Sequence, residues 1–357
     1  MKIQTLSAVI GNQACDGGCP FCVAGMTGFD QLPPKCPIDK LGFQKSMRWA
    51  EIGECTTCLL TGKGEPTLYP DEVTSYLQML QDEFEAGRGF PALELQTNAL
   101  RISKLAYLWG TAGEWDDMEQ FCESLTPFAE SCNQPKTEWS VGWAWEPTYR
   151  EAVQLQTLLR HMMQWKELGL DYLAVSVVDT DEENNRKIYL HHRKDPYLPL
   201  GQTIKFIHAL GLRVRLCVMM HKGMVDSPKE LERVIAWSKL HKVEQLTARP
   251  IRKPSGTVKI DGADPIIQYT TENGLGFNRE LQIHEWIATM IESGRAKKLM
   301  TLMHGKNAAH VYDVEGQNFC LADCLTIESD SDDIRTLIFH RSGDITYDWA
   351  FRGAILR

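Results

Sequence analysis

Three cysteines near the start of the chain form its most specific chemical feature. They are Cys15, Cys19 and Cys22, in the stretch NQACDGGCPFCVAGMTG, and their spacing is C-x3-C-x2-C. Thiolates bind zinc and iron, and a [4Fe–4S] cluster takes one protein ligand per iron, normally four thiolates. Three cysteines on one loop would hold three irons and leave the fourth open to a small molecule. Gly17 and Gly18 would let the backbone wrap closely around such a cluster.

Two other interpretations of the cysteine loop remain open, a structural zinc knuckle and three unrelated thiols. Zinc sites usually combine two C-x2-C pairs, or one pair with histidines. No second pair stands at the usual distance, and no histidine precedes His161. The spacing therefore favours an iron–sulfur cluster.

Composition limits the class of protein. The chain has 357 residues, of which 43% are hydrophobic and 24% charged, and a formal net charge of -9. No run of 18 apolar residues predicts a membrane span, and the N-terminal stretch MKIQTLSAVIGNQ does not resemble a signal peptide. We expect a cytoplasmic protein whose eleven cysteines stay reduced. The negative charge argues against duplex nucleic acid as a partner, although local arginines could hold a small phosphorylated substrate.

The elements that must position the cysteine loop alternate between strand and helix. This order predicts βα units, a parallel sheet and chemistry at the carboxyl ends of the strands. Six units are too few for a closed eight-stranded barrel, so we expect a partial (βα)6 barrel of the TIM type. The predicted strands are 3–10, 55–62, 92–98, 171–178, 212–220 and 243–251. The predicted helices are 37–52, 71–84, 150–169, 199–211 and 227–241.

Two regions depart from this repeat. Residues 111–150 contain four of the ten tryptophans. They form either an insertion that packs its own apolar cluster or part of a substrate lid, and packing is the favoured interpretation. Residues 256–357 form an α+β C-terminal extension, in which two alternating runs around the turn RSGD predict a hairpin. We expect a barrel domain over 1–255 and a C-terminal cap over 256–357.

Several motifs, taken together, resemble the radical S-adenosylmethionine (radical SAM) enzymes. CDGGCPFC is similar to their C-x3-C-x-aromatic-C signature. GKGEP, after the second predicted strand, resembles their GGEP motif with Lys63 in place of a glycine, and LQTNA resembles a common ending of the third strand. GLDYLAVSVVDTDEENNRKI and GLRVRLCVMMHKGMVDSPKELERVIAWSK resemble the cyclic pyranopterin (molybdopterin-precursor) synthase branch. The resemblance covers roughly residues 1–255.

The resemblance implies a cofactor pair and a reaction. The three cysteines would bind a [4Fe–4S] cluster, and the free iron would be chelated by the amino and carboxylate groups of S-adenosylmethionine. The reduced cluster would cleave the cofactor to a 5′-deoxyadenosyl radical that abstracts a substrate hydrogen. This chemistry requires a low-potential cluster, a dry pocket and an electron donor such as flavodoxin or ferredoxin.

The resemblance also implies roles for residues around the cofactor. Phe21 would lie against the adenine, or else it is a core anchor. The turn would receive the methionyl ammonium on main-chain carbonyls while Glu65 orients it, although such a turn also occurs as a plain strand-to-helix connection. The residues of this turn are Gly62, Gly64, Glu65 and Pro66.

Polar residues on the later predicted strands are further candidates. Asn98 and Ser176 would contact the hydroxyl and carboxylate groups of the cofactor, or else they form ordinary backbone hydrogen bonds. Arg249 would hold the cofactor carboxylate or an anionic substrate, with Arg213 and Arg215 as alternatives for that role. Structural ion pairs are the competing interpretation of all three arginines. No residue is identified as catalytic.

A second cluster is a weaker prediction. Cys320 and Cys324, in QNFCLADCLT, resemble the segment that binds a second cluster in the synthase branch. Their spacing is C-x3-C and no cysteine follows, so a third ligand would have to be Cys36, Cys122, Cys132 or a residue of another type. Free thiols are the favoured interpretation. The pair His191 and His192 is more simply a surface pair than a substrate contact.

The sequence thus predicts a radical SAM enzyme with a small-molecule substrate, in which a nucleotide, nucleoside or other small heteroaromatic compound is favoured. A peptide-modifying maturase is the alternative, and an activator of a glycyl-radical protein is a third. A non-catalytic iron–sulfur or zinc-binding regulatory protein is the hypothesis from another class.

Overall fold

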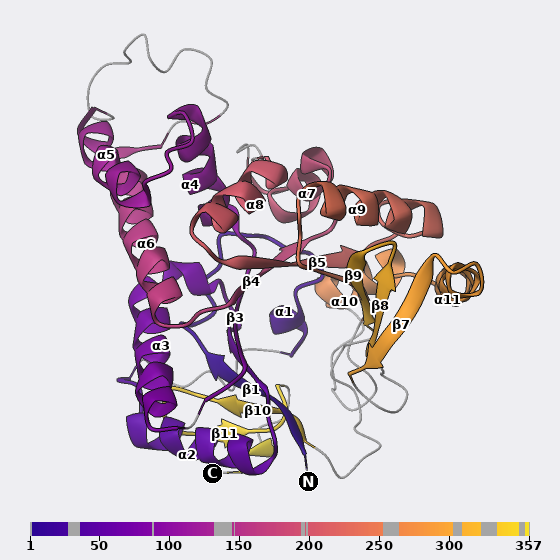
Figure 1. Ribbon diagram of the computed structural model, residues 1–357, viewed down its shortest axis with the longest axis horizontal. Helices are drawn as coiled ribbons and strands as arrows, with labels where there is room; N and C mark the ends of the chain where they lie inside the picture. Colours follow the sequence, from indigo (N-terminus) through magenta and orange to yellow (C-terminus); the bar gives the residue numbers. More distant parts are fainter. Residues whose placement is uncertain are drawn as a thin grey trace.

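A single mixed sheet is the centre of the fold in this computed structural model. The structure describes residues 2–27, 36–87, 89–131, 145, 147–193, 197, 199–252, 264–302, 309–322, 334–349 and 354–356. In this part of the chain the sheet has eleven strands in the order β11-β10-β1-β2-β3-β4-β5-β6-β9-β8-β7. The sheet is curved, and most helices lie along its outer side (Figure 1).

The strands of the βα repeat are parallel and stand next to one another in chain order. They are β1 (Ile3–Val9), β2 (Thr57–Thr61), β3 (Ala92–Thr97), β4 (Tyr172–Val177), β5 (Arg213–Met220) and β6 (Gln245–Pro250). The helices that precede or link them are α1 (Val23–Thr27), α2 (Lys40–Ile52), α3 (Pro70–Glu85), α4 (Leu100–Thr111), α5 (Met118–Ser131), α6 (Tyr149–Glu167), α7 (Glu182–Tyr189), α8 (Leu200–Ala209) and α9 (Pro228–Leu240). The predicted partial (βα)6 barrel is confirmed.

Local sequence signals explain where the helices begin and end. Ser227 caps α9 by accepting a hydrogen bond from the N–H of Glu230, and Pro228 occupies the first helical position. Gly169 and Gly211 follow α6 and α8 with φ of +88° and +72°. Only glycine adopts this left-handed conformation without strain, so these two residues end the helices and turn the chain into β4 and β5.

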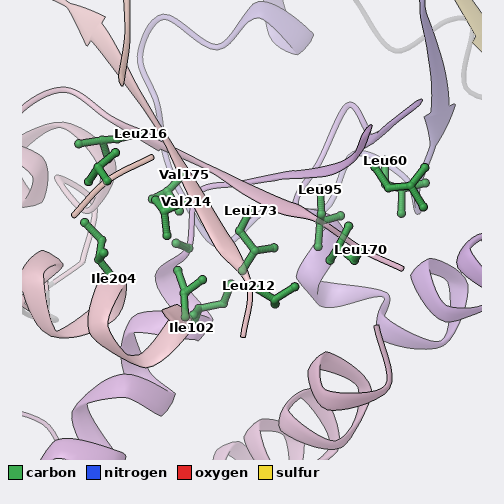
Figure 2. Packing of buried hydrophobic residues seen from close by; sticks show 14 of the residues in the cluster. Leu60, Leu95, Ile102, Leu170, Leu173, Val175, Ile204, Leu212, Val214 and Leu216 are labelled. Atoms are coloured by element: carbon green, nitrogen blue, oxygen red, sulfur yellow. The ribbon is translucent and has the colours of Figure 1, made fainter. Parts of the chain in front are cut away.

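The outer side of the strands packs on the helices and forms the main hydrophobic core. Alternate strand residues face this side, since side chains of a strand alternate between its two faces. Figure 2 shows the part of the core where strand residues meet α4 and α8. The labelled side chains are Leu60, Leu95, Ile102, Leu170, Leu173, Val175, Ile204, Leu212, Val214 and Leu216.

The inner side of the strands carries a chain of polar side chains. Thr61 Oγ1 donates to Gln96 Oε1 at 2.9 Å, and Gln96 Nε2 donates to Glu94 Oε1 at 3.2 Å. Arg215 donates to Glu94 Oε2 at 2.7 Å and, through Nε, to Thr247 Oγ1 at 3.2 Å. The Glu94 carboxylate raises the pKa of Arg215 despite its burial. A parallel sheet covered on both faces is normally apolar on both, so this polar lining indicates a binding interior.

The C-terminal region extends the same sheet at both edges. Here β9 (Gln317–Ala322) pairs in parallel with β6, and β10 (Ile334–Phe339) pairs in parallel with β1. The remaining elements are α10 (Pro265–Asn273), α11 (Phe277–Glu292), β7 (Ala296–Thr301), β8 (Ala309–Val314) and β11 (Ile345–Thr346). The antiparallel pair β10 and β11 confirms the predicted hairpin. The division of the chain near residue 255 stays a prediction.

The tryptophan-rich region packs on the main core as far as it is described. Trp145 is 8% exposed and belongs to that core, and Trp115 packs against it. Trp139 and Trp143 lie outside the described residues. Among the described helices, none has the length and apolar character that crossing a membrane requires.

Candidate functional site

The cysteine loop follows β1 and lies at the carboxyl end of that strand. Cys15 is the most accessible of the three thiols, while Cys19 and Cys22 are half-buried. Burial, together with the charges of Cys22 and Cys15, raises the pKa of Cys19 well above its usual range. Burial also raises the pKa of Cys15 to about 11, with smaller contributions from Glu65, Asp16 and Cys22. The three thiols are therefore close enough to repel one another as thiolates.

Such a donor set fits a cationic metal centre. Thiols that resist ionisation together release their protons when a metal supplies the compensating positive charge. Among the described residues, no three His, Cys, Asp or Glu side chains converge as ligands of one metal ion. A [4Fe–4S] cluster does not require that convergence, because each cysteine binds a different iron.

The glycine turn after β2 touches the cysteine loop through backbone atoms. Glu65 N–H donates to Ala14 O at 2.9 Å. A Cβ on Gly64 would lie 2.3 Å from the carbonyl oxygens of both Ala14 and Asn12, and a Cβ on Gly62 would lie 2.5 Å from Ile10 O. Only glycine allows this approach. The structure thus brings two of the sequence-predicted motifs into direct contact.

Glu65 connects this turn to the end of β3. It is 2% exposed. Its Oε1 accepts hydrogen bonds from Thr67 N–H at 3.0 Å, Thr67 Oγ1 at 2.7 Å and Thr97 Oγ1 at 2.6 Å. Its Oε2 accepts from Asn98 N–H at 2.8 Å. Burial, with the charge of Asp16, raises the pKa of Glu65 to about 7. Pro66 begins the short 3-10 helix Pro66–Leu68, which Glu65 caps.

Asn98 connects the end of β3 to the cysteine loop. Its Nδ2 donates to Asp16 Oδ1 at 2.8 Å and approaches Cys15 Sγ at 3.5 Å, and its Oδ1 accepts from Leu100 N–H at 2.9 Å. Arg101 Nε stands 3.7 Å from Asp16 Oδ2. The side chain of Asn98 thus orients the loop, and its contact with the cofactor stays a prediction.

Phe21 is buried in a small apolar core at the carboxyl ends of the strands. Its ring centroid lies 6.4 Å from that of Tyr189 and 6.3 Å from that of His221. Leu100, Val178, Ile188, Leu190, Tyr197 and Ile251 complete this cluster, and Cys19 packs against it. We call this set the upper core. Phe21 is thus part of a core beside the cysteine loop, and its contact with the adenine stays a prediction.

Ser176 and Arg249 lie on the inner side of the sheet, near the carboxyl ends of β4 and β6. Ser176 is in register with Cys217 of β5, and Arg249 with Met219. Arg249 Nε is buried and has no hydrogen-bond partner among the described residues. Arg215 is engaged by Glu94, and Arg213 pairs with Asp171 at 2.7 Å at the amino end of β5. Of the three predicted arginines, Arg249 has the buried donor that is still available.

The cysteines of the predicted second cluster are not brought together in the described residues. Cys320 is buried in β9, in register with Thr247 and Val311. Cys324 and Cys132 lie outside the described residues. Cys122 is buried in α5, where its Sγ faces Gln156 O at 3.9 Å. Cys36 precedes α2. The second cluster stays a prediction.

Sequence reasoning missed several neighbours of the cysteine loop. Tyr189 O accepts from Gly18 N–H at 2.8 Å, and an added Cβ on Gly18 would lie 2.5 Å from His192 Nδ1 and 3.2 Å from His191 Cε1. The two histidines are exposed, as expected, yet they stand against the loop. Cys217 is half-buried on the inner side of the sheet, in register with Ser176. No spacing in the sequence links these residues to the cysteines.

Comparisons with known proteins give similarity in structure only. No protein-family model matches the chain, and no curated protein does. A radical SAM methyltransferase from Sphaerobacter thermophilus is similar at 16% identity and TM-score 0.43, over 80% of this chain and 63% of that chain. Native anSMEcpe with bound AdoMet is similar at 11% identity and TM-score 0.48, over 98% of this chain and 75% of that chain. Methylornithine synthase (PylB) is similar at 10% identity and TM-score 0.42, over 80% of this chain and 63% of that chain.

The chain thus spans less than two thirds of the methyltransferase and of methylornithine synthase. Because these TM-scores lie below 0.5, they do not define the activity of this chain.

Proposed function

We propose that the chain is a radical SAM enzyme. One observation carries the proposal: the loop of Cys15, Cys19 and Cys22 is joined by backbone contact to the turn of Gly62, Gly64 and Glu65. The first motif supplies three thiolates, and the second supplies main-chain groups beside them. A zinc knuckle or a redox sensor would have no need for the second motif or for a polar interior at the same end of the sheet.

The two motifs divide the cofactors between them. Cys15, Cys19 and Cys22 would hold a [4Fe–4S] cluster. S-adenosylmethionine would be held by Phe21, Gly62, Gly64, Glu65, Pro66, Asn98, Ser176 and Arg249. When bound, the reduced cluster would supply one electron to the sulfonium of S-adenosylmethionine, which would release methionine and the 5′-deoxyadenosyl radical that takes a hydrogen atom from the substrate.

The chain's own residues would bind the cofactor, orient it and exclude water from it. Glu65 accepts two hydrogen bonds from Thr67 in the turn. It accepts two more from Thr97 and Asn98 at the end of β3, which fix the turn against that strand. The buried Nε of Arg249 fits a carboxylate, which arginine binds with charge-assisted hydrogen bonds. The upper core excludes water from the side of the loop that carries Cys19.

The substrate would be a nucleotide, a nucleoside or another small heteroaromatic compound. The resemblance of residues 169–188 and 211–239 to the cyclic pyranopterin synthase branch supports this class, and so does the inner polar chain from Thr61 to Thr247. Such a chain suits a polar small molecule. An external one-electron donor of the flavodoxin or ferredoxin type would reduce the cluster.

Anaerobic reconstitution with iron and sulfide tests the proposal. The protein should bind about four irons per chain and form 5′-deoxyadenosine with dithionite and S-adenosylmethionine. Cys19→Ala should lose both properties, while Cys58→Ala, which removes a buried thiol from the main hydrophobic core, should keep them. A colourless, zinc-loaded protein after the same handling would refute the proposal. Residual iron in a Cys15/Cys19/Cys22 triple alanine variant would reveal a second cluster.

A further inference from the structure

The upper core contains two tyrosine hydroxyls that have no hydrogen-bond partner in the part of the chain that the structure describes. Tyr189 is 2% exposed and Tyr197 is 6% exposed. Neither hydroxyl has a donor or acceptor partner among the described residues. A buried hydroxyl left unpaired is costly, and native structures rarely retain one without a reason. Phenylalanine would fill the same volume without that cost.

Both tyrosines stand beside the cysteine loop. The carbonyl of Tyr189 accepts a hydrogen bond of 2.8 Å from the N–H of Gly18, the residue before Cys19. The ring centroid of Tyr189 lies 6.4 Å from that of Phe21 and 6.4 Å from that of Tyr197. Cys19 packs against the cluster that contains all three rings.

Both tyrosine hydroxyls are buried in the cluster that Cys19 packs against. Burial is the main reason that the pKa values of Tyr189 and Tyr197 are raised, and the Cys19 thiolate is the next. The charges of Cys217 and Cys15 add to the effect at Tyr189. A neutral phenol is a hydrogen-bond donor, and both rings belong to the cluster against which Cys19 packs.

We propose that the hydroxyls of Tyr189 and Tyr197 donate hydrogen bonds to the sulfur atoms of a cluster held by Cys15, Cys19 and Cys22. This inference rests on the proposed function, which supplies the cluster. Sulfide and thiolate sulfur become more negative when the cluster is reduced, so donors stabilise the reduced form more than the oxidised form. The tyrosine pair would thus make the reduction potential less negative and bring the cluster within reach of its electron donor.

The test is a redox titration of the reconstituted protein without S-adenosylmethionine. The electron paramagnetic resonance signal of the reduced cluster measures the reduction potential. The variants are Tyr189→Phe, Tyr197→Phe and the double variant. Tyr76→Phe is the matched control, because the Tyr76 hydroxyl is also buried and unpartnered among the described residues. Tyr76 packs with Phe43 and Phe339 in the main hydrophobic core, which is a different cluster from the upper core.

We expect a more negative potential in each single variant, a larger shift in the double variant, and the wild-type value in Tyr76→Phe. Unchanged potentials in variants that keep their full iron content would overturn the inference and leave the proposed function intact. Should one single variant lose its iron, the other provides the same measurement. A wild-type protein that assembles no cluster would instead overturn the proposed function, and this inference with it.

Discussion

Lys63 Nζ donates a 2.9 Å hydrogen bond to the backbone oxygen of Trp349, 286 positions away in the sequence. Lys63 stands in the glycine turn where the radical SAM motif has a glycine, and its side chain is 4% exposed. Trp349 follows β11, so the C-terminal segment reaches the turn that contacts the cysteine loop. The departure from the motif thus provides a hydrogen bond between the glycine turn and the C-terminal segment.

Replacing this lysine should destabilise the apoprotein. In Lys63→Met the carbonyl of Trp349 loses a charged donor in a buried place, and we expect the free energy of unfolding to fall by about 1–3 kcal/mol. Chemical denaturation measures the change. Lys2→Met is the control, since the Lys2 ammonium is exposed and lies 3.4 Å from Glu54. That variant should change stability by less than about 1 kcal/mol, and equal effects of the two substitutions would refute the assigned role.

Stability should also depend on pH through His340, which is 2% exposed in the same region. Burial lowers the pKa of His340 to about 4, with a smaller contribution from the charge of Lys63, while Asp344 opposes the shift. The unfolded chain binds the proton near pH 6.5 and the folded chain does not. Stability is therefore full above pH 6.5 and falls as the pH decreases toward 4, by roughly 3 kcal/mol.

Urea denaturation of the apoprotein between pH 4 and 7.5 measures this slope, with His340→Gln as the comparison. The variant lacks the titrating ring, so its stability should fall less over the same interval. A wild-type profile parallel to that of the variant would contradict the assignment.

Local signals were sufficient for the repeat of the fold. The apolar runs predicted β1 to β6 within about two residues at each end, and Gly169 and Gly211 marked helix ends because their φ values of +88° and +72° suit only glycine. The outer strands were not predictable in the same way. The pairing of β10 with β1 joins residues about 330 positions apart, and no local pattern encodes that neighbour.

The same distinction holds for the candidate site, where short motifs were predictable from the sequence and long-range contacts were not. The spacing of the cysteines predicted a cluster-binding loop, and GKGEP predicted a cofactor-binding turn. The structure brings this loop and this turn into contact. Tyr189 and Tyr197 had no such signal, because an isolated aromatic residue in a sequence indicates only a core position. The role of Asn98 was also beyond the sequence, since its partners Asp16 and Cys15 lie more than 80 positions away.

Contact between the turn and the loop should fail in Gly64→Ala. The added Cβ would lie 2.3 Å from two backbone carbonyl oxygens, those of Ala14 and Asn12, and no side-chain rotation relieves that overlap. We expect a loss of about 1–3 kcal/mol in the apoprotein and less iron after reconstitution. Gly276→Ala is the control, because no atom lies within 4 Å of its added Cβ. Since Gly276 caps α11, that control should cost at most about 1 kcal/mol, and it should leave iron binding intact.

Gly18 and His192 should behave as a coupled pair. An added Cβ on Gly18 would lie 2.5 Å from His192 Nδ1, and Arg193 Nε donates to the other ring nitrogen at 3.0 Å, which holds the ring in place. The φ of Gly18 is outside the left-handed region, so the strain in the alanine variant comes from the two histidines, and mainly from His192. Gly18→Ala should therefore lower iron binding, His192→Ala should leave it unchanged, and the double variant should recover most of it. Iron per chain and apoprotein stability, measured as a double-mutant cycle, test this coupling. Additive effects of the two substitutions would mean that the histidine does not constrain the loop.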